Sequence, residues 1–374
     1  MKVVVVGAGQ AGVALAAKLR ALGHDGTITL IGEEAVPPYQ RPPLSKGYLL
    51  GDMGVDRLTL RGDAFFAENG IDLRLGAPVT ALDRQARVVT VGNDAIPFDH
   101  LALTTGSVAR VLPGAYPVRT LADVDRMRHE FAPGRRVLIV GGGYVGLEAA
   151  AVAAKLGLRV TLVEAAPRIL NRVASERTAE FFRDLHRKHG VEIVEGAPVT
   201  EAQMAAADFV IAGIGIQPAT ALAEAAGLPI DNGIAADARG RVVDGIWAAG
   251  DCASFPWRGG RVRLESVQNA IDQAELVAAN IMGAGREYSP VPWFWSDQYD
   301  VKLQIVGLGT GHDRVVERHS GTGLSLWYYR GAELLAVDAM NDPRAFMVAK
   351  RLLEAGRSPD PALIPDAADL KVLL

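Results

Sequence analysis

The chain has 374 residues, 49% of them hydrophobic, which is enough for more than one buried core and excludes a disordered protein. The net charge is −4, and no run of lysine and arginine is long enough to follow a nucleic-acid backbone, so no nucleic-acid partner is expected. No apolar run approaches the roughly 20 residues that cross a bilayer, and Cys252 is the only cysteine. We therefore expect a cytoplasmic protein with no membrane segment and no internal disulfide.

The chain opens with the apolar run VVVV, then GAGQAG, then a helical pattern of small and apolar residues that reaches about Leu22. In such a strand–turn–helix unit the first glycine permits the sharp turn, the second lets the backbone approach a pyrophosphate, and the third lets the helix pack closely on the sheet. Gly7, Gly9 and Gly12 stand at these positions. The next predicted strand, in GTITLIGEE, ends in Glu33, one residue beyond the usual place of a ribose-binding acid.

A second copy of the motif, VLIVGGGYVG, begins at residue 137, and Gly141, Gly143 and Gly146 stand at the same three positions. The strand in LRVTLVEAAPR then ends directly in Glu164, which predicts a ribose ligand, with a surface acid as the alternative. A single G-x-G-x-x-G can be an ordinary tight turn. Two copies, each behind a strand and before a helix, predict two dinucleotide sites.

The second half of the chain returns to a Rossmann-like pattern and then changes in texture. RVVDGIWAAGDCA is predicted as one buried strand that ends near Asp251, and ESVQNAIDQAELVAANIMG as a helix. Beyond Pro290, aromatic-rich alternating strands and a helix near residues 343–356 predict a smaller α+β domain. The histidines show no metal-ligand spacing, so no metal is expected, and His186 and His189 are predicted to be solvated on a charged helix.

Several motifs together carry a resemblance that covers the whole chain. PYQRPPLSKGYL, LALTTG, VLIVGGGYVGLEAA, VIAGIGIQP, WAAGDCA, ESVQNAIDQAE and PWFWSDQY occur in that order. In this pattern the chain resembles the FAD-dependent, NADH-utilising ferredoxin reductases of the putidaredoxin reductase and aromatic dioxygenase type. The resemblance implies that one cradle binds FAD and the other NADH, so that two electrons from NADH pass through the flavin to a [2Fe–2S] ferredoxin.

The resemblance also implies an architecture. It predicts an α/β fold with two Rossmann-like domains in a glutathione-reductase-like arrangement, and a smaller α+β domain at the C-terminus. The predicted boundaries are 1–109 with 216–291 for FAD, 110–215 for NAD, and 292–374 for the last domain. The implied protein is a monomer or weak homodimer whose ferredoxin supplies a cytochrome P450 or a Rieske-type oxygenase. A rubredoxin reductase, an NADH oxidase or a redox-sensing protein like apoptosis-inducing factor are the alternatives.

Carried onto matching positions, the resemblance assigns site residues on both sides. On the flavin side they are Gly7, Gly9, Ala11, Gly12, Glu33, Arg41, Lys46, Val79, Arg119, Asp251, Val267 and Trp295. On the NAD side they are Gly141, Gly143, Tyr144, Val145, Gly146, Glu164, Arg172 and Gly213.

The implied catalytic residues are Lys46 and Glu148, paired beside the flavin because a lone buried ammonium would be costly. Lys46 is expected in a loop held extended by Pro42 and Pro43; a solvated lysine and a helix-surface acid are the alternatives. Trp295 is either a core aromatic or a neighbour of the nicotinamide, and Cys252 is expected to be structural. The stretch VEGAPVTEAQMAAADFVIAGIG is shorter than in typical relatives, so a β-hairpin is expected to be missing there.

Overall fold

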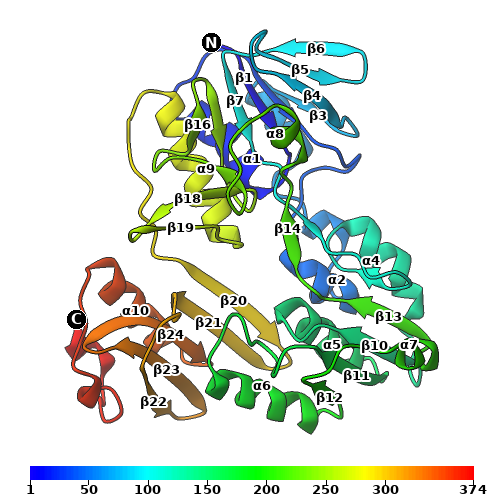
Figure 1. Cartoon of the computed structure of the whole chain (residues 1–374), viewed down its shortest axis with the longest axis vertical. Coiled ribbons are helices and arrows are strands. Elements are labelled where there is room, and N and C mark those ends of the chain that lie inside the picture. The colour runs from blue at the N-terminus through cyan, green and yellow to red at the C-terminus, as the bar shows by residue number, and fades with distance from the viewer. The chain divides into compact units, whose positions relative to one another are not determined.

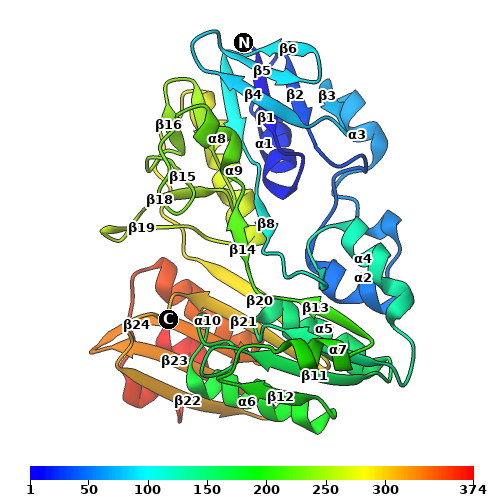
Figure 2. The same cartoon turned by 45° about the vertical axis from the view of Figure 1, so that its right-hand side comes forward.

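The computed structural model describes residues 1–374, apart from the side chain of Asp63, and the chain divides into two compact units (Figures 1 and 2). The first unit comprises Met1–Gln40, Val55–Val108 and Ile216–Pro290. The second comprises Arg41–Gly54, Ala109–Gly215 and Val291–Leu374. Each unit contains one of the two glycine fingerprints.

The first unit is built on a six-stranded sheet with the order β16-β17-β7-β1-β2-β3. All neighbouring strands are parallel except β16 and β17. The central strands β1 and β2 are buried at every residue, as strands covered on both faces must be. The bounds are β1 Val3–Val6, β2 Ile28–Ile31, β3 Ile71–Arg74, β7 His100–Leu103, β16 Arg241–Val243 and β17 Ile246–Ala248.

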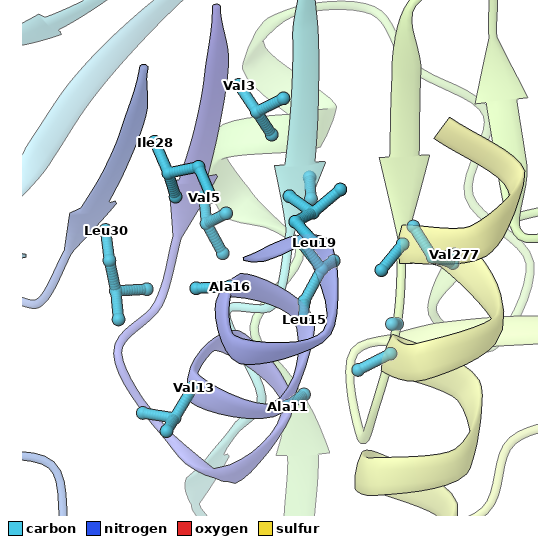
Figure 3. Close-up of a cluster of buried hydrophobic side chains, with 14 of the residues drawn as sticks. Val3, Val5, Ala11, Val13, Leu15, Ala16, Leu19, Ile28, Leu30 and Val277 are labelled. Atoms are coloured by element: carbon cyan, nitrogen blue, oxygen red, sulfur yellow. The ribbon is translucent and has the colours of Figure 1, made fainter. Parts of the chain in front are cut away.

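Two helices, α1 (Gln10–Ala21) and α9 (Val267–Ile281), form the main core of this unit with the sheet. Figure 3 shows Leu15 and Leu19 of α1 among the valines and leucines of the strands on one side and Val277 of α9 on the other. These three side chains are fully buried, and each contributes about 2 kcal/mol by leaving water. The core fixes where α1 begins, and therefore where the first cradle lies.

Smaller elements complete the first unit. Two three-stranded sheets have the orders β4-β5-β6 and β15-β18-β19, and β8 pairs with β14. The strands are β4 Val79–Asp83, β5 Val88–Val91, β6 Asp94–Pro97, β8 Ser107–Ala109, β14 Ile216–Pro218, β15 Ile234–Ala235, β18 Ala253–Trp257 and β19 Gly260–Val262. The short helices are η2 Val55–Arg57, α3 Asp63–Glu68 and α8 Ala221–Ala225.

The prediction of one strand over RVVDGIWAAGDCA is wrong. The segment forms an antiparallel hairpin, in which Val243 of β16 pairs with Ile246 of β17. The connecting residues Asp244 and Gly245 are a typical hairpin turn sequence, and Gly245 has a φ of +71°, which other residues rarely adopt. The hydrophobic run therefore folds back on itself at the Asp-Gly pair.

The second unit contains a five-stranded parallel sheet with the order β12-β11-β10-β13-β9. Its strands are β9 Tyr116–Pro117, β10 Arg136–Val140, β11 Arg159–Glu164, β12 Glu192–Glu195 and β13 Phe209–Ala212. Its helices are α5 Tyr144–Lys155, α6 Glu176–Lys188 and α7 Glu201–Ala206. Between β12 and β13, where a hairpin was expected to be missing, the chain forms only α7, which Thr200 and Gln203 cap reciprocally.

An antiparallel sheet with the order β20-β21-β24-β23-β22 follows in the same unit. Its strands are β20 Trp293–Gln298, β21 Val301–Gly307, β22 Arg314–Ser320, β23 Gly323–Arg330 and β24 Glu333–Met340. The sequence did not predict β22, because this edge strand carries charged residues, which discourage pairing with other chains. Helix α10 (Pro343–Glu354), η4 (Pro361–Leu363) and η5 (Leu370–Leu373) cover the buried Trp327 and Tyr329.

The segment that contains Lys46 is helical and not extended, so that prediction is wrong. Pro42 and Pro43 begin the 3-10 helix η1 (Pro42–Ser45), and α2 (Gly47–Leu50) follows directly. Proline suits the first turn of a helix because its φ is preset and its missing N–H is not needed there. The nearby elements of this unit are α4 (Leu121–Met127) and η3 (Arg128–Glu130). Throughout the described chain, no helix is both long and apolar enough to cross a membrane.

Candidate functional site

The first cradle lies between β1 and α1, and two of its three glycines are required by the packing of the protein itself. Gly7 has a φ of +112°, and a Cβ there would lie 2.2 Å from the Thr104 carbonyl oxygen. A Cβ on Gly12 would lie 2.0 Å from the Gly7 carbonyl oxygen. A Cβ on Gly9 would meet no atom within 4 Å, so this position opens onto free space. The backbone there can approach a large anionic ligand.

The second cradle, between β10 and α5, repeats this arrangement. Gly141 has a φ of +103°, and its Cβ would lie 2.5 Å from the Gly213 carbonyl oxygen. A Cβ on Gly146 would lie 2.0 Å from the Gly141 carbonyl oxygen, whereas one on Gly143 would meet only Gly213 at 4.0 Å. Gly213, predicted on the NAD side, packs against this turn, where a Cβ on it would lie 3.0 Å from the Gly146 backbone.

Both cradles present helix N-termini with free backbone donors. Gly9 caps α1 and Gly143 caps α5, and neither provides a side chain that accepts from the first N–H groups. These groups, together with the positive end of the helix dipole, attract an anion such as a pyrophosphate. The open second glycine and the uncapped helix therefore fit a dinucleotide in each unit.

The acids at the ends of the second strands differ between the cradles. Val140 pairs with Val163, so Glu164 lies opposite Gly141, whereas Val6 pairs with Ile31 and places Gly32 opposite Gly7. Glu164 is fixed in place: its Oε2 accepts from the Gly142 N–H at 2.6 Å and its Oε1 from the Ala166 N–H at 2.7 Å. Glu33 is exposed and lies two residues beyond its strand.

The remaining flavin-side residues predicted from the resemblance are divided between the units. In the first unit, Ala11 is buried in α1, Val79 is half-buried at the start of β4, and Val267 begins α9. Asp251 is half-buried and accepts from the Ser107 hydroxyl at 2.9 Å. Arg41, Lys46, Arg119 and Trp295 belong to the second unit.

On the NAD side, Tyr144 and Val145 begin α5, and the Tyr144 ring lies 4.6 Å from that of Phe294. The Tyr144 hydroxyl is buried with no hydrogen-bond partner, and burial raises its pKa well above the usual range. Val145 and Arg172 are exposed. The Arg168 guanidinium donates to backbone carbonyls of Ala174 at 2.8 Å and of Ser175 and Ile169 at 3.3 Å. It holds the loop beyond Glu164 in place.

The structure forms the predicted ion pair between Lys46 and Glu148, with Nζ 2.9 Å from Oε2. Glu148 lies on α5 and is only 3% exposed, so it is not a helix-surface acid. Two hydroxyls donate to the same carboxylate: Ser45 to Oε2 at 2.5 Å and Ser296 to Oε1 at 2.6 Å. A buried carboxylate with an ammonium and two hydroxyl donors is fully satisfied, which is the condition for keeping a charge inside a protein.

Other predicted residues of the second unit lie on neighbouring elements. The Arg41 guanidinium donates to the Arg119 carbonyl oxygen at 2.8 Å, so these two are adjacent. Trp295 is half-buried on β20, with its ring 5.7 Å from that of Trp293. Because side chains alternate along a strand, Trp295 and Ser296 point to opposite faces of β20.

Sequence reasoning missed Ser45 and Ser296 and misplaced His186. His186 is fully buried on α6, not solvated, and its Nε2 lies 2.8 Å from Oε1 of Gln298. Its neighbour His189 is exposed and stacks on Tyr299 at 3.7 Å. The helical pattern showed charges on both sides of His186, but its partner lies more than one hundred residues away. The one available signal was the alternation in FWSDQ, which puts Ser296 and Gln298 on one face.

Cys252 is fully buried, and its Sγ lies 3.4 Å from the carbonyl oxygens of Leu103 and Ala249. Burial raises the pKa of its thiol, which suits a structural residue and not a reactive thiolate. In the described part of the chain, no group of three or more His, Cys, Asp or Glu side chains is placed to hold a metal ion.

Comparison with known proteins places this geometry in a family. Residues 1–274 match the model of the pyridine nucleotide-disulphide oxidoreductases, and residues 293–374 match the reductase C-terminal domain. The chain is 41% identical to rhodocoxin reductase of Rhodococcus erythropolis, covering 100% of this chain and 94% of the relative. It is 39% identical to putidaredoxin reductase of Pseudomonas putida over 97% and 94% of the two chains.

A solved structure agrees over the whole chain. The covalent putidaredoxin reductase–putidaredoxin complex superposes with a TM-score of 0.94 at 38% identity, covering 100% of this chain and 97% of the other. The chain therefore belongs to the pyridine nucleotide-disulphide oxidoreductase family, in the group that carries the reductase C-terminal domain. The predicted resemblance and the predicted fold class are both confirmed.

Proposed function

We propose that the protein is an NADH:ferredoxin oxidoreductase that holds FAD in the first cradle and binds NADH in the second. The observation that carries the proposal is the presence of two complete cradles, each with an open second glycine and an uncapped helix N-terminus. The bound flavin would accept two electrons from NADH and release them singly, which is the conversion that a one-electron iron–sulfur acceptor needs.

The residues of the chain would bind the two cofactors, orient them and shield them from water. In the first unit, the fingerprint glycines and Ala11 would contact the FAD pyrophosphate, with Glu33, Val79, Asp251 and Val267 along the rest of the molecule. Arg41, Lys46, Arg119 and Trp295 would complete the flavin side.

In the second unit, the cradle with Tyr144, Val145 and Gly213 would hold NADH. There Glu164 would accept from a ribose hydroxyl, and Arg172 would lie near the adenosine end. The fixed Glu164 carboxylate favours NADH over NADPH, because it accepts from a 2′-hydroxyl and repels a 2′-phosphate.

The partner would be a small [2Fe–2S] ferredoxin in the cytoplasm, and the downstream enzyme a cytochrome P450 or Rieske-type oxygenase. The names of relatives support this: one is the ferredoxin reductase component of the anthranilate 1,2-dioxygenase system of Burkholderia cepacia, 40% identical over 97% of this chain. The domain boundaries that we propose are those expected from the sequence: 1–109 with 216–291, 110–215, and 292–374.

The proposal is tested with the FAD-bound protein and putidaredoxin as the probe acceptor. Flavin reduction by NADH, followed by ferredoxin reduction that depends on the amount of probe, is the expected result. Rapid oxygen consumption without ferredoxin reduction would indicate an NADH oxidase. Reduction of rubredoxin alone would indicate a rubredoxin reductase, and a stable reduced complex without turnover would indicate a redox-sensing protein.

The proposed catalytic pair has its own test. Lys46→Ala and Glu148→Ala should each slow flavin reduction by NADH while leaving FAD bound, because backbone contacts hold the dinucleotide. The double variant should lose less than the sum of the single losses, as neighbours 2.9 Å apart do. Stopped-flow absorbance at the flavin band measures all three. A wild-type rate for Lys46→Ala rejects its role, and strict additivity rejects the pair.

A further inference from the structure

A chain of buried side-chain hydrogen bonds leads away from Glu148 toward the end of α6. Ser296 donates to Glu148 at 2.6 Å, and Gln298 Nε2 donates to the Ser296 hydroxyl at 3.2 Å. Gln298 Oε1 lies 2.8 Å from His186 Nε2, and the Tyr299 hydroxyl lies 3.2 Å from His186 Nδ1. Ser296, Gln298 and His186 are each at most 1% exposed.

The donor and acceptor atoms of these groups give the series of hydrogen bonds a single direction. The Gln298 amide nitrogen faces Ser296, so its oxygen faces His186 and must accept from the Nε2–H of that ring. The Nδ1 of the same neutral ring then accepts from the Tyr299 hydroxyl. Every donor in the series points toward the Glu148 carboxylate, and bonds aligned in this way polarise one another.

The surrounding fold holds the residues of this hydrogen-bond series in place. Ser296 and Gln298 lie two residues apart on β20, so they share a face of the strand. Helix α6 is tied to the same sheet by Arg177, whose Nε lies 2.9 Å from Glu317 Oε2. Tyr299 adopts a φ of +56°, rare for a bulky residue, at the turn that sets its ring against His186 and His189.

We propose that Ser296, Gln298, His186 and Tyr299 are positioning residues that hold the Glu148 carboxylate in the orientation that pairs with Lys46. The chain is not a proton path, because the Gln298 amide cannot pass a proton along without changing its own bonding. The effect of this hydrogen-bond series on catalysis rests on the proposed reductase function. The geometry of the series does not depend on that function.

The first test reads the geometry without any turnover. In FAD-bound protein labelled with ¹⁵N-histidine, the His186 imidazole should be neutral and protonated at Nε2 from pH 6 to pH 8. Tyr299→Phe, which keeps the ring and removes the hydroxyl, should leave this tautomer in place, because the Gln298 oxygen still accepts from Nε2–H. A charged ring, or one protonated at Nδ1 in the wild-type protein at pH 7, overturns the proposal.

The second test reads the consequence at the ion pair. His186→Leu should slow flavin reduction by NADH by about fivefold to tenfold, the scale of one lost hydrogen bond. His186→Gln, whose amide can donate toward Gln298, should restore most of the rate. Thr178→Val is the matched control: it removes another buried bond on α6, outside the chain, and should lower the melting temperature without changing the rate.

The outcomes separate this proposal from the proposed function. If Thr178→Val slows reduction as much as His186→Leu, or if His186→Leu reduces at the wild-type rate, the positioning role is rejected. If His186→Leu does not fold, Tyr299→Phe replaces it, with a smaller loss of about twofold to threefold expected, and a wild-type rate again rejects the role. If wild-type protein with FAD bound is not reduced by NADH at all, the proposed function fails, and the histidine tautomer still decides the geometry.

Discussion

The two cradles have the same order of strand, glycine turn and helix, and one difference between them is a pair of facing residues at the turn. In the first, Ala8 faces Gly32, and a Cβ on Gly32 would lie 2.8 Å from the Ala8 Cβ. In the second, Gly142 faces Glu164, and a Cβ on Gly142 would lie 3.2 Å from Glu164 Oε2 and 2.6 Å from Ile169 Cγ2. Each cradle thus has room for one side chain at this place.

The facing pair decides whether an acid can stand next to the glycine turn. Where the turn residue is glycine, the strand-end residue can be a glutamate that is held by the turn N–H, 2.6 Å from its carboxylate. Where the turn residue is alanine, the residue that follows the strand is Gly32, and the next acid along the chain, Glu33, is exposed. Both cradles have the three fingerprint glycines at the same positions, and the second has a fourth, Gly142, which faces the acid.

The largest expected effect comes from breaking each cradle in turn. Gly12→Ala and Gly146→Ala place a Cβ 2.0 Å from a carbonyl oxygen and should each cost about 2–4 kcal/mol. Gly12→Ala should lose FAD, whereas Gly146→Ala should keep FAD and lose the response to NADH. Flavin content and thermal melting check both.

The matched controls are Gly9→Ala and Gly143→Ala, where the new Cβ meets no protein atom closer than 4.0 Å. These should melt within a few degrees of wild type and weaken only the dinucleotide of their own cradle. Loss of folding in a control would mean that space at the second glycine is not reserved for a ligand.

Two buried groups give the stability of the unit with the second cradle opposite dependences on pH. Burial lowers the pKa of His186 to about 4 and raises that of Asp338 to about 6. The histidine contributes stability above its unfolded pKa of about 6.5, which is lost as pH falls toward 4. The aspartate contributes stability below its unfolded pKa of about 3.9, which is lost as pH rises through 6.

Each contribution is on the order of 3 kcal/mol, so the two slopes nearly cancel between pH 4 and pH 6 in the wild-type protein. Asp338→Asn should therefore become more stable as pH rises through this window, and His186→Gln less stable. Urea midpoints measured at pH 4, 5, 6 and 7 check the sign. Parallel profiles for the two variants would contradict it.

A smaller effect is expected for coenzyme choice. Glu164→Ala should narrow the preference for NADH over NADPH by about 1–3 kcal/mol, the scale of one hydrogen bond to a charged group. The ratio of kcat/KM for the two coenzymes measures it. Glu33→Ala, the corresponding change in the first cradle, serves as the control and should leave that ratio unchanged. An unchanged ratio in Glu164→Ala would remove this residue from ribose binding.

The smallest effect tests the facing pair directly. Ala8→Gly removes a methyl group from the turn and should cost about 0.4–1 kcal/mol, because glycine gives the unfolded chain more conformational freedom. Gly142→Ala should also tilt Glu164 away from its N–H donor, so that its coenzyme preference falls toward that of Glu164→Ala. If Gly142→Ala retains the full preference for NADH, the facing pair does not set the position of the acid.

The sequence predicted what short-range signals encode. Both fingerprints, their helices and the acid at position 164 follow from residues within about thirty positions of one another, and the structure places them as expected. Two errors arose where a local signal was misjudged: Pro42 and Pro43 begin a 3-10 helix, and Asp244 with Gly245 folds a strand back.

Two other features were missed for a different reason: the burial of His186 and the hydrogen bond from Ser296 to Glu148. The residues involved are separated by more than one hundred positions, and only the docking of β20 against α5 and α6 brings them together. Periodicity on α6 could not reveal them, because the face that α6 buries is decided by a sheet formed much later in the chain.

The backbone N–H of Arg110 donates to the carbonyl of Gly215 at 3.0 Å, so the two ends of the stretch that holds the second cradle are clasped together. A segment whose two ends lie side by side can be replaced as one piece, because the flanking residues need not move to join the new segment. A graft of residues 110–215 from an NADPH-dependent relative would carry its coenzyme choice with it.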